Sequence, residues 1–220
     1  RTQYRTYYLH SDGRANTAQG DGALTTTAPT KNEKPDHYDY DPADPARFMG
    51  VTNYAQLGSA DDYRPAESRN DVLVFSTAPV TEPMEVCGPV KAQIYAATSA
   101  KDTDWIARLI DVHPNGYAQR LREGIVRARF HKSLEREDFV PPGQIEAFDL
   151  DLLSTCVRLM DGHRLRIEIT SSSLPLFDRN MNTGGKLGLE STGVVAHQTI
   201  YHDAQHPSHV VVPIVETPKP

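Results

Sequence analysis

Residues 162–184 read Gly162-His-Arg-Leu-Arg-Ile-Glu-Ile-Thr-Ser-Ser-Ser-Leu-Pro-Leu-Phe-Asp-Arg-Asn-Met-Asn-Thr-Gly184. In the first half, the apolar residues Leu165, Ile167 and Ile169 alternate with polar neighbours. Because successive side chains of a β-strand point to opposite faces, this pattern predicts a strand with one buried and one solvent-facing side. The side chains expected to face solvent are Arg164, Arg166, Glu168 and Thr170.

The second half of this stretch predicts a polar loop. The strand is expected to end at Ser171-Ser172-Ser173 and Pro175, because proline has no N–H to donate to a sheet. The group Asp178-Arg179-Asn180 follows beside Phe177. It has two interpretations: a contact with a ligand or partner, or an internal Asp–Arg cluster that pins loops over one end of a sandwich. The planar guanidinium suits both, and we favour the structural one.

Composition limits the class of protein. The chain has 220 residues, of which 38% are hydrophobic, and this suits one all-β domain with a buried core. A formal net charge of −6 argues against a generic nucleic-acid binder. No apolar stretch reaches the ~18 residues of a membrane span, and no signal peptide is visible. We expect a single β-sandwich domain over residues 1–216 and a tail over 217–220. The start at Arg1 fits a domain cut from a larger protein, either cytoplasmic or secreted.

Short alternating or apolar runs predict roughly ten strands with little helical periodicity. These runs cover residues 3–9, 21–27, 71–76, 86–98, 105–112, 117–121, 125–132, 145–152, 156–160, 164–170, 197–203 and 209–215. Such a pattern is typical of a two-sheet β-sandwich, and we expect jelly-roll connectivity. The side chains expected in its core are Leu165, Ile167, Ile169, Val90, Ile94, Val126 and Phe130.

The regular pattern is lost over residues 28–70. Five prolines interrupt this segment, and it carries the aromatics Tyr38, Tyr40, Phe48, Tyr54 and Tyr63. An irregular segment of this length inside a domain is usually functional or packed against a partner. That many aromatic residues argue against disorder.

The sequence offers no self-sufficient catalytic or metal site. A Gly-x-Ser-x-Gly nucleophile elbow is absent, and residues 188–193 have the wrong spacing around Ser191. The late histidines, at positions 197, 202, 206 and 209, lack the spacing of zinc sites, and residues 111–116 lack that of a calcium loop. We therefore expect no cofactor, no tightly bound metal, and no hydrolysis of acyl esters or X-Pro peptides by this chain alone.

The two cysteines and the single tryptophan are interpreted as structural residues. Cys87 and Cys156 lie in strand-like runs, and we interpret them as small buried hydrophobes rather than a disulfide. Trp105 opens an apolar strand, so it belongs to the core or a domain interface more readily than to a sugar-binding platform.

A set of strings appears in order along nearly the whole chain. They are Tyr38-Asp-Tyr-Asp-Pro-Ala-Asp-Pro45, Asp71-Val-Leu-Val-Phe-Ser-Thr77, Glu85-Val-Cys-Gly-Pro-Val90, Ser99-Ala-Lys-Asp-Thr-Asp-Trp105, Gly124-Ile-Val-Arg-Ala-Arg129, Gly162-His-Arg-Leu-Arg166, Phe177-Asp-Arg-Asn180, Asn182-Thr-Gly184, Gln198-Thr-Ile200 and His206-Pro-Ser208. Together they resemble the C-terminal domain of the CocE/NonD hydrolases, which include cocaine esterase, α-amino acid ester hydrolases and X-Pro dipeptidyl-peptidases.

This resemblance implies a galactose-binding-like jelly roll and a parent serine hydrolase. The catalytic triad of the family lies in an upstream α/β-hydrolase domain, so none of it maps onto this chain. What carries over is a supporting role, in which the sandwich packs on the α/β-hydrolase and cap domains and helps wall the substrate cleft.

Two function hypotheses follow, an accessory domain of an esterase or peptidase and an independent carbohydrate- or protein-binding module. For the first, the expected partners are the upstream hydrolase and cap domains, with a homo-oligomer left open and no nucleic acid or membrane. We expect the segment 28–70 to meet these domains. The interface or cleft-lip candidates are Phe48, Tyr54, Trp105, Asp178, Arg179 and Asn180.

Overall fold

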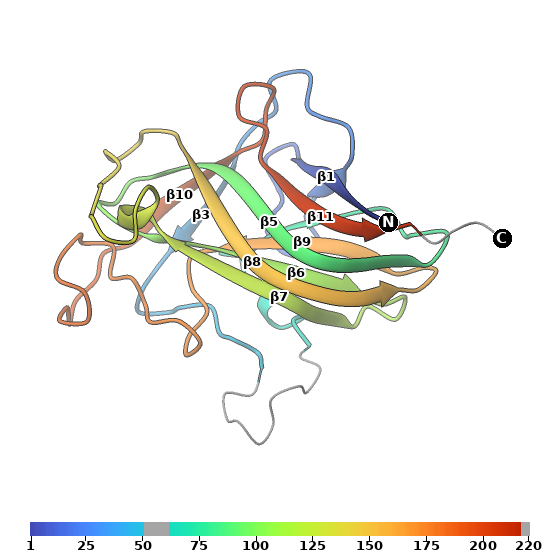
Figure 1. Ribbon diagram of the computed structural model, residues 1–220. Helices are drawn as coiled ribbons and strands as arrows, with labels where there is room; N and C mark the ends of the chain where they lie inside the picture. Colours follow the sequence, from blue (N-terminus) through green and yellow to red (C-terminus); the bar gives the residue numbers. More distant parts are fainter. Residues whose placement is uncertain (51–61, 217–220) are drawn as a thin grey trace.

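The protein is described by a computed structural model that covers residues 1–50 and 62–216 (Figure 1). Its strands are β1 (Thr2–His10), β2 (Ala23–Thr25), β3 (Asp36–Tyr40), β4 (Leu73–Ser76), β5 (Met84–Thr98), β6 (Asp104–Val112), β7 (Ala118–Arg127), β8 (Glu146–Leu159), β9 (Arg164–Thr170), β10 (Ala196–Tyr201) and β11 (His209–Val215). The helical elements within these residues are two 3₁₀ turns, η2 (Ala66–Ser68) and η3 (Ala128–Phe130). The predicted all-β class is confirmed.

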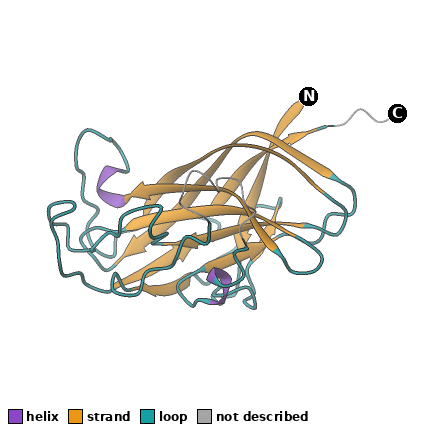
Figure 2. Cartoon of the chain, turned by 90° about the horizontal axis from the view of Figure 1, so that it is seen from below, coloured by secondary structure: helices purple, strands orange, loops and turns teal. Residues whose placement is uncertain are grey.

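The strands form one hydrogen-bonded sheet that curls into two layers (Figures 1 and 2). The strand order is β3-β10-β5-β11-β1-β2-β4-β9-β6-β7, and β8 pairs with β5. Gly124 allows β7 to pass close to β8, because a Cβ atom at this position would collide with the Asp151 carbonyl oxygen. Side chains from both layers meet in one large core, as a β-sandwich requires.

Most of the predicted core residues lie in this core. Leu165, Ile167 and Ile169 are at most 1% exposed, as are Val90 and Ile94 on the facing layer. Val126 is half-buried at the margin of the core.

The prediction for Phe130 is wrong. The chain leaves the sheet after Arg127 and turns into η3, so the alternation of the strand does not continue to this residue. Phe130 is half-buried, whereas the neighbouring Arg129 is 2% exposed and pairs with Asp102.

The prediction of a solvent-facing side for β9 is also wrong. Arg166, Glu168 and Thr170 are buried, with Glu168 and Thr170 at most 1% exposed. A strand between two neighbours in a sheet still exposes its outer face unless another segment covers it. Here residues 63–67 cover it, since Glu67 pairs with Arg166 and Tyr63 lies over Arg108 on the adjacent β6.

The segment 28–70 is less irregular than predicted. Its residues Asp36–Tyr40 form β3, an edge strand that pairs with β10 in antiparallel register. Buried and exposed side chains alternate along β3, but five residues give too short a pattern to stand out among the surrounding prolines and charges.

The interpretation of the cysteines as buried hydrophobes is wrong. Cys87 and Cys156 lie opposite each other in the β5–β8 ladder and form a disulfide. Cys87 is half-buried and Cys156 is exposed. Two cysteines separated by 69 residues carry no local signal of their pairing, which only the strand register reveals.

Candidate functional site

The outer face of β9 and β6 carries a buried charge cluster, which we define as Arg108, Glu123, Glu168, Glu67 and Arg166. Arg108 is 0% exposed; its Nε donates to Glu123 Oε1 at 3.0 Å and its Nη1 to Glu168 Oε2 at 3.2 Å. Glu67 in η2 pairs with Arg166 at 2.5 Å. Because buried charges persist in a fold only when they are paired, this cluster ties η2 and the end of the long segment to the sheet.

Within this cluster, the carboxyl group of Glu168 has a raised pKa. Burial raises the pKa of its carboxyl to about 8; the adjacent Arg108 opposes this shift, and the neighbouring Glu67 carboxylate reinforces it. The folded protein therefore keeps a proton on Glu168 at pH values where the unfolded chain has released it.

We expect this group to make the protein less stable as the pH rises. A carboxyl whose pKa is raised on folding contributes its stabilisation below its unfolded pKa and loses it as the pH passes through the folded value, about 8 here. Glu168→Gln, which stays neutral, should flatten the decline in unfolding free energy between pH 5 and pH 8.5. Urea unfolding across this range measures the slope.

The control is Glu135→Gln, because Glu135 is exposed in the loop after η3. His202 contributes a decline of the same sign: burial lowers its pKa, but the pairs with Asp36 and Glu33 outweigh burial and raise it. This contribution is present in all three proteins and cancels in the comparison. Equal slopes for wild type and Glu168→Gln would show that Glu168 does not hold a proton in the fold.

The polar group Asp178-Arg179-Asn180 divides into a buried and an exposed part. Asn180 is 3% exposed, and its amide nitrogen donates to Asp102 Oδ2 at 2.8 Å and to Asp104 Oδ1 at 2.9 Å. Asp178 and Arg179 are exposed. The predicted internal cluster is therefore present only at Asn180, which holds its loop to the start of β6. The side chains of Asp178 and Arg179 lie at the surface.

Residues 41–50 run beside the loop that contains this group. The Phe48 N–H donates to the Leu174 carbonyl at 3.0 Å, and the Leu174 N–H donates to the Ala46 carbonyl at 3.1 Å. Arg179 Nη1 donates to the Pro42 carbonyl at 2.7 Å. We call residues 41–50 and 174–195 together the end surface, since these bonds join them at one end of the sandwich (Figure 1).

Apolar side chains gather on the end surface. Half of the large hydrophobic side chains that are exposed in the described part of the chain belong to it. They are Leu176, Leu187, Leu189, Val194 and Val195. Beside them, Arg127, Leu174, Asp178 and Leu187 help to line a hollow of about 550 Å³. Clustered exposed apolar groups with a polar rim are typical of a protein interface.

The other interface candidates have different positions. Phe48 is half-buried, with the Arg120 guanidinium 4.7 Å from its ring centroid. Tyr54 lies outside the described residues. Trp105 has to be removed from the candidates, because it is 0% exposed and its ring centroid lies 5.6 Å from that of Phe148 in the core.

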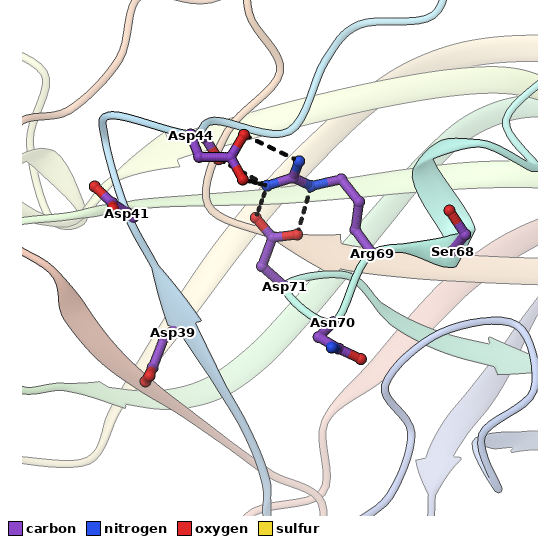
Figure 3. Close-up of a pocket in the computed structure, with 7 residues that line it drawn as sticks. All are labelled: Asp39, Asp41, Asp44, Ser68, Arg69, Asn70 and Asp71. Carbon is purple, nitrogen blue, oxygen red and sulfur yellow. Dashed lines mark hydrogen bonds and ion pairs between the residues drawn. The ribbon is translucent and has the colours of Figure 1, made fainter.

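A second, acidic hollow of about 370 Å³ borders the end surface (Figure 3). Arg69 lies at its centre; its Nε donates to Asp71 Oδ1 at 2.7 Å and its Nη2 to the Asp44 carbonyl at 2.7 Å. Asp39 and Asp41 complete the acidic lining. Arg69 directly follows η2 and bonds to the 41–44 turn. We therefore interpret this hollow as a place where two parts of the segment 28–70 are held together, not as a ligand site.

Ser191 and two of the late histidines lie at separate places in the fold. Ser191 lies in an exposed loop, with no α-helix following it in residues 192–216. His202 is buried between Asp36, at 2.9 Å, and Glu33, at 3.2 Å, whereas His197 is exposed and bonds Asp39. Within residues 1–50 and 62–216, the helical elements are short 3₁₀ turns, and none of them could span a bilayer.

A comparison with protein families shows which family the chain belongs to. The model of the X-Pro dipeptidyl-peptidase C-terminal non-catalytic domain matches residues 1–211. The chain belongs to this family. The sequence resemblance to the C-terminal domain of CocE/NonD hydrolases is thereby confirmed.

Known relatives of this family member are longer proteins. The cocaine esterase of Rhodococcus sp. (strain MB1 Bresler) is 40% identical over 219 residues, which cover 98% of this chain but 38% of that protein. An aminopeptidase from the marine sediment archaeon Thaumarchaeota archaeon has a similar structure with a TM-score of 0.85, at 27% identity over 97% of this chain and 37% of its own. An α-amino acid ester hydrolase gives a TM-score of 0.84 at 27% identity over 96% of this chain and 36% of its own.

Sequence reasoning missed the buried charge cluster, although one signal was present. Arg108 interrupts the apolar run of β6, which reads Trp-Ile-Ala-Arg-Leu-Ile over residues 105–110. A charged residue inside such a run is either at an exposed edge or buried with partners. Its partner Glu67 comes from the segment 28–70, whose path the sequence does not reveal.

Proposed function

We propose that this chain is the non-catalytic C-terminal sandwich of a CocE/NonD-type serine hydrolase, and that it packs on the α/β-hydrolase and cap domains of the same polypeptide. The observation that carries this proposal is the family match over residues 1–211, together with relatives in which the matching part is about 38% of the protein. In this role the domain holds no catalytic group. It supports the other domains and forms one wall of the substrate cleft.

The end surface is the part of the sandwich that we assign to this contact. Its apolar residues Leu176, Leu187 and Leu189 are 40–71% exposed, and burying them against a partner removes apolar surface from water. Phe48 belongs to the same surface, where its N–H donates to the Leu174 carbonyl, and we assign its half-buried side chain to the contact with the acyl group of a substrate. The rim charges Asp178 and Arg179 supply polar contacts around this apolar centre.

The alternative, an independent carbohydrate-binding module, needs exposed aromatic platforms. Among the described residues, the large aromatic side chains classed as exposed are Tyr4 and Phe139, which lie on β1 and in the loop before β8, while Trp105 is buried. Tyr95 and Tyr201 lie opposite each other on β5 and β10, but both are half-buried and His206 packs against both rings, so we favour the interdomain role.

The test uses the gene product that contains this chain and compares it with the chain alone. Residues 174–195 should be protected from hydrogen exchange in the longer protein and less protected in the isolated domain. In the longer protein, Phe48→Ala should change the discrimination in kcat/KM between small and bulky acyl esters by roughly 1–3 kcal/mol, the scale of altered pocket packing. The isolated domain should not hydrolyse p-nitrophenyl acetate.

Met160→Ala is the matched control, because Met160 is 50% exposed at the end of β8 far from the end surface. It should leave kcat/KM and the exchange pattern unchanged. Two results would remove the interdomain role: a native gene product no larger than this chain, or identical exchange of residues 174–195 with and without the additional domains. If only the selectivity test failed, so that Phe48→Ala left the discrimination between small and bulky acyl esters unchanged, the domain would not form a wall of the substrate cleft.

A further inference from the structure

Three potential metal-binding side chains meet at the other end of the sandwich, where β6 ends and β9 begins. One ligand atom each from Asp111, His113 and His163 lies within 4.8 Å of the other two. Asn180 is held at the start of β6 and Asp111 lies near its end, so most of the strand separates this group from the loop 174–195. We propose that these three residues form a binding site for a divalent transition-metal ion of the zinc type.

The backbone places these side chains on one face. Asp111 and His113 are two residues apart, so both point to the same side of the chain. The β6–β9 ladder pairs Asp111 with Leu165 and Val112 with Arg164, so its next step sets His113 opposite His163. On the other side of β6, Asp111 pairs with Gln119 of β7. The donors therefore come from the fixed register of three strands.

The distances suit a metal centre. His163 Nδ1 lies 2.8 Å from Asp111 Oδ1, and His113 Nε2 lies 3.8 Å from Asp111 Oδ2. Ligand atoms held at ~2.0–2.2 Å from one zinc ion are about 3–3.5 Å apart, so these separations lie on either side of that range. Gln119 Oε1, 3.3 Å from His113 Nε2, offers a further oxygen to the site.

Chemistry and burial favour the same conclusion. Two imidazoles and a carboxylate suit zinc and related transition metals better than calcium or magnesium, which prefer oxygen donors. The Asp111 side chain is 4% exposed, the His163 side chain 12% and the His113 side chain 32%, so the group is largely shielded but open on one side. The ring centroids of His113 and His163 are 4.3 Å apart, so the two imidazoles already pack against each other beside Asp111.

Binding would join two turns that are distant in sequence. His113 begins the β6–β7 turn, and His163 ends the β8–β9 turn, in which Gly162 approaches Pro114. The ion would replace the hydrogen bond between His163 Nδ1 and Asp111 Oδ1, and the ring proton of the neutral imidazole would then be carried by His163 Nε2. Because the ion binds the folded arrangement, it should stabilise the fold by an amount that grows with the logarithm of its concentration once this exceeds the dissociation constant.

The test is titration of the chelator-treated chain with zinc chloride by isothermal calorimetry. We expect one ion per chain and a higher melting temperature with zinc present. His163→Gln and His113→Gln should each weaken binding by more than the ~10–100-fold lost when an outer-shell partner is removed. His197→Gln is the control, because His197 is exposed and bonds Asp39 elsewhere on the fold.

A measurement on the wild-type chain covers the case in which a variant does not fold. In long-range ¹H–¹⁵N spectra, zinc should shift the ring nitrogens of His113 and His163 and leave those of His197 and His202 in place. Absence of stoichiometric binding would overturn the site, as would unchanged affinity in the folded His113→Gln/His163→Gln double variant. Equal shifts of all histidines would mean that zinc binds only adventitiously. The expectation of no metal would then stand.

Discussion

Arg108→Ala is expected to lower the unfolding free energy by about 3–5 kcal/mol, the usual cost of removing one partner from a buried ion pair. Arg108 is 0% exposed and bonds Glu123, Glu168 and the Ser172 carbonyl. Its loss leaves two carboxyl groups and one carbonyl buried with fewer partners. Urea unfolding followed by the fluorescence of Trp105, the single tryptophan and a buried one, measures the change.

The control for this substitution is Arg136→Ala. Arg136 is exposed, so its removal tests the loss of a positive charge without burial, and the change should stay within ~0.5 kcal/mol. A second comparison separates charge from packing. Arg108→Met combined with Glu168→Gln should cost less than the sum of the two single changes, because the Arg108–Glu168 bond that each single change breaks is lost only once in the double variant. Strict additivity would contradict the proposed coupling between the two side chains.

Ile167→Ala should destabilise the domain by about 2–5 kcal/mol, from lost apolar burial and the cavity left behind. Ile167 is 1% exposed at the middle of β9, between β4 and β6, and its side chain belongs to the main core. The surrounding strands are held by hydrogen bonds on both sides, so the site has little freedom to collapse around the smaller side chain. The same urea experiment gives the value.

Leu134→Ala is the matched control for an aliphatic truncation, since Leu134 is 89% exposed in a loop. Its midpoint of unfolding should be close to that of the wild type. If Ile167→Ala also left the midpoint unchanged, the β9 face that carries Leu165 and Ile169 would not be the core of the sandwich.

Local patterns in the sequence located several strands and turns, and the ordered strings identified the family. Alternation along residues 164–170 located β9 and its core side, because the period of two is a property of the extended backbone. Asn115-Gly116, a pair that favours tight turns, lies in the β6–β7 turn, where Gly116 has a φ of 84° that other residues rarely adopt. The ordered strings, spread over nearly the whole chain, carried the resemblance that the family match confirms.

The tertiary structure alone decided what covers each face and which distant residues meet. Arg166 and Glu168 alternate with the core residues as solvent-facing side chains do, yet η2 and Tyr63 bury them. Cys87 meets Cys156, and His113 meets His163, through strand register over long sequence separations. A local pattern fixes the direction of a side chain relative to its own strand, but burial and ligand geometry depend on contacts between segments far apart in the chain, which no local pattern contains.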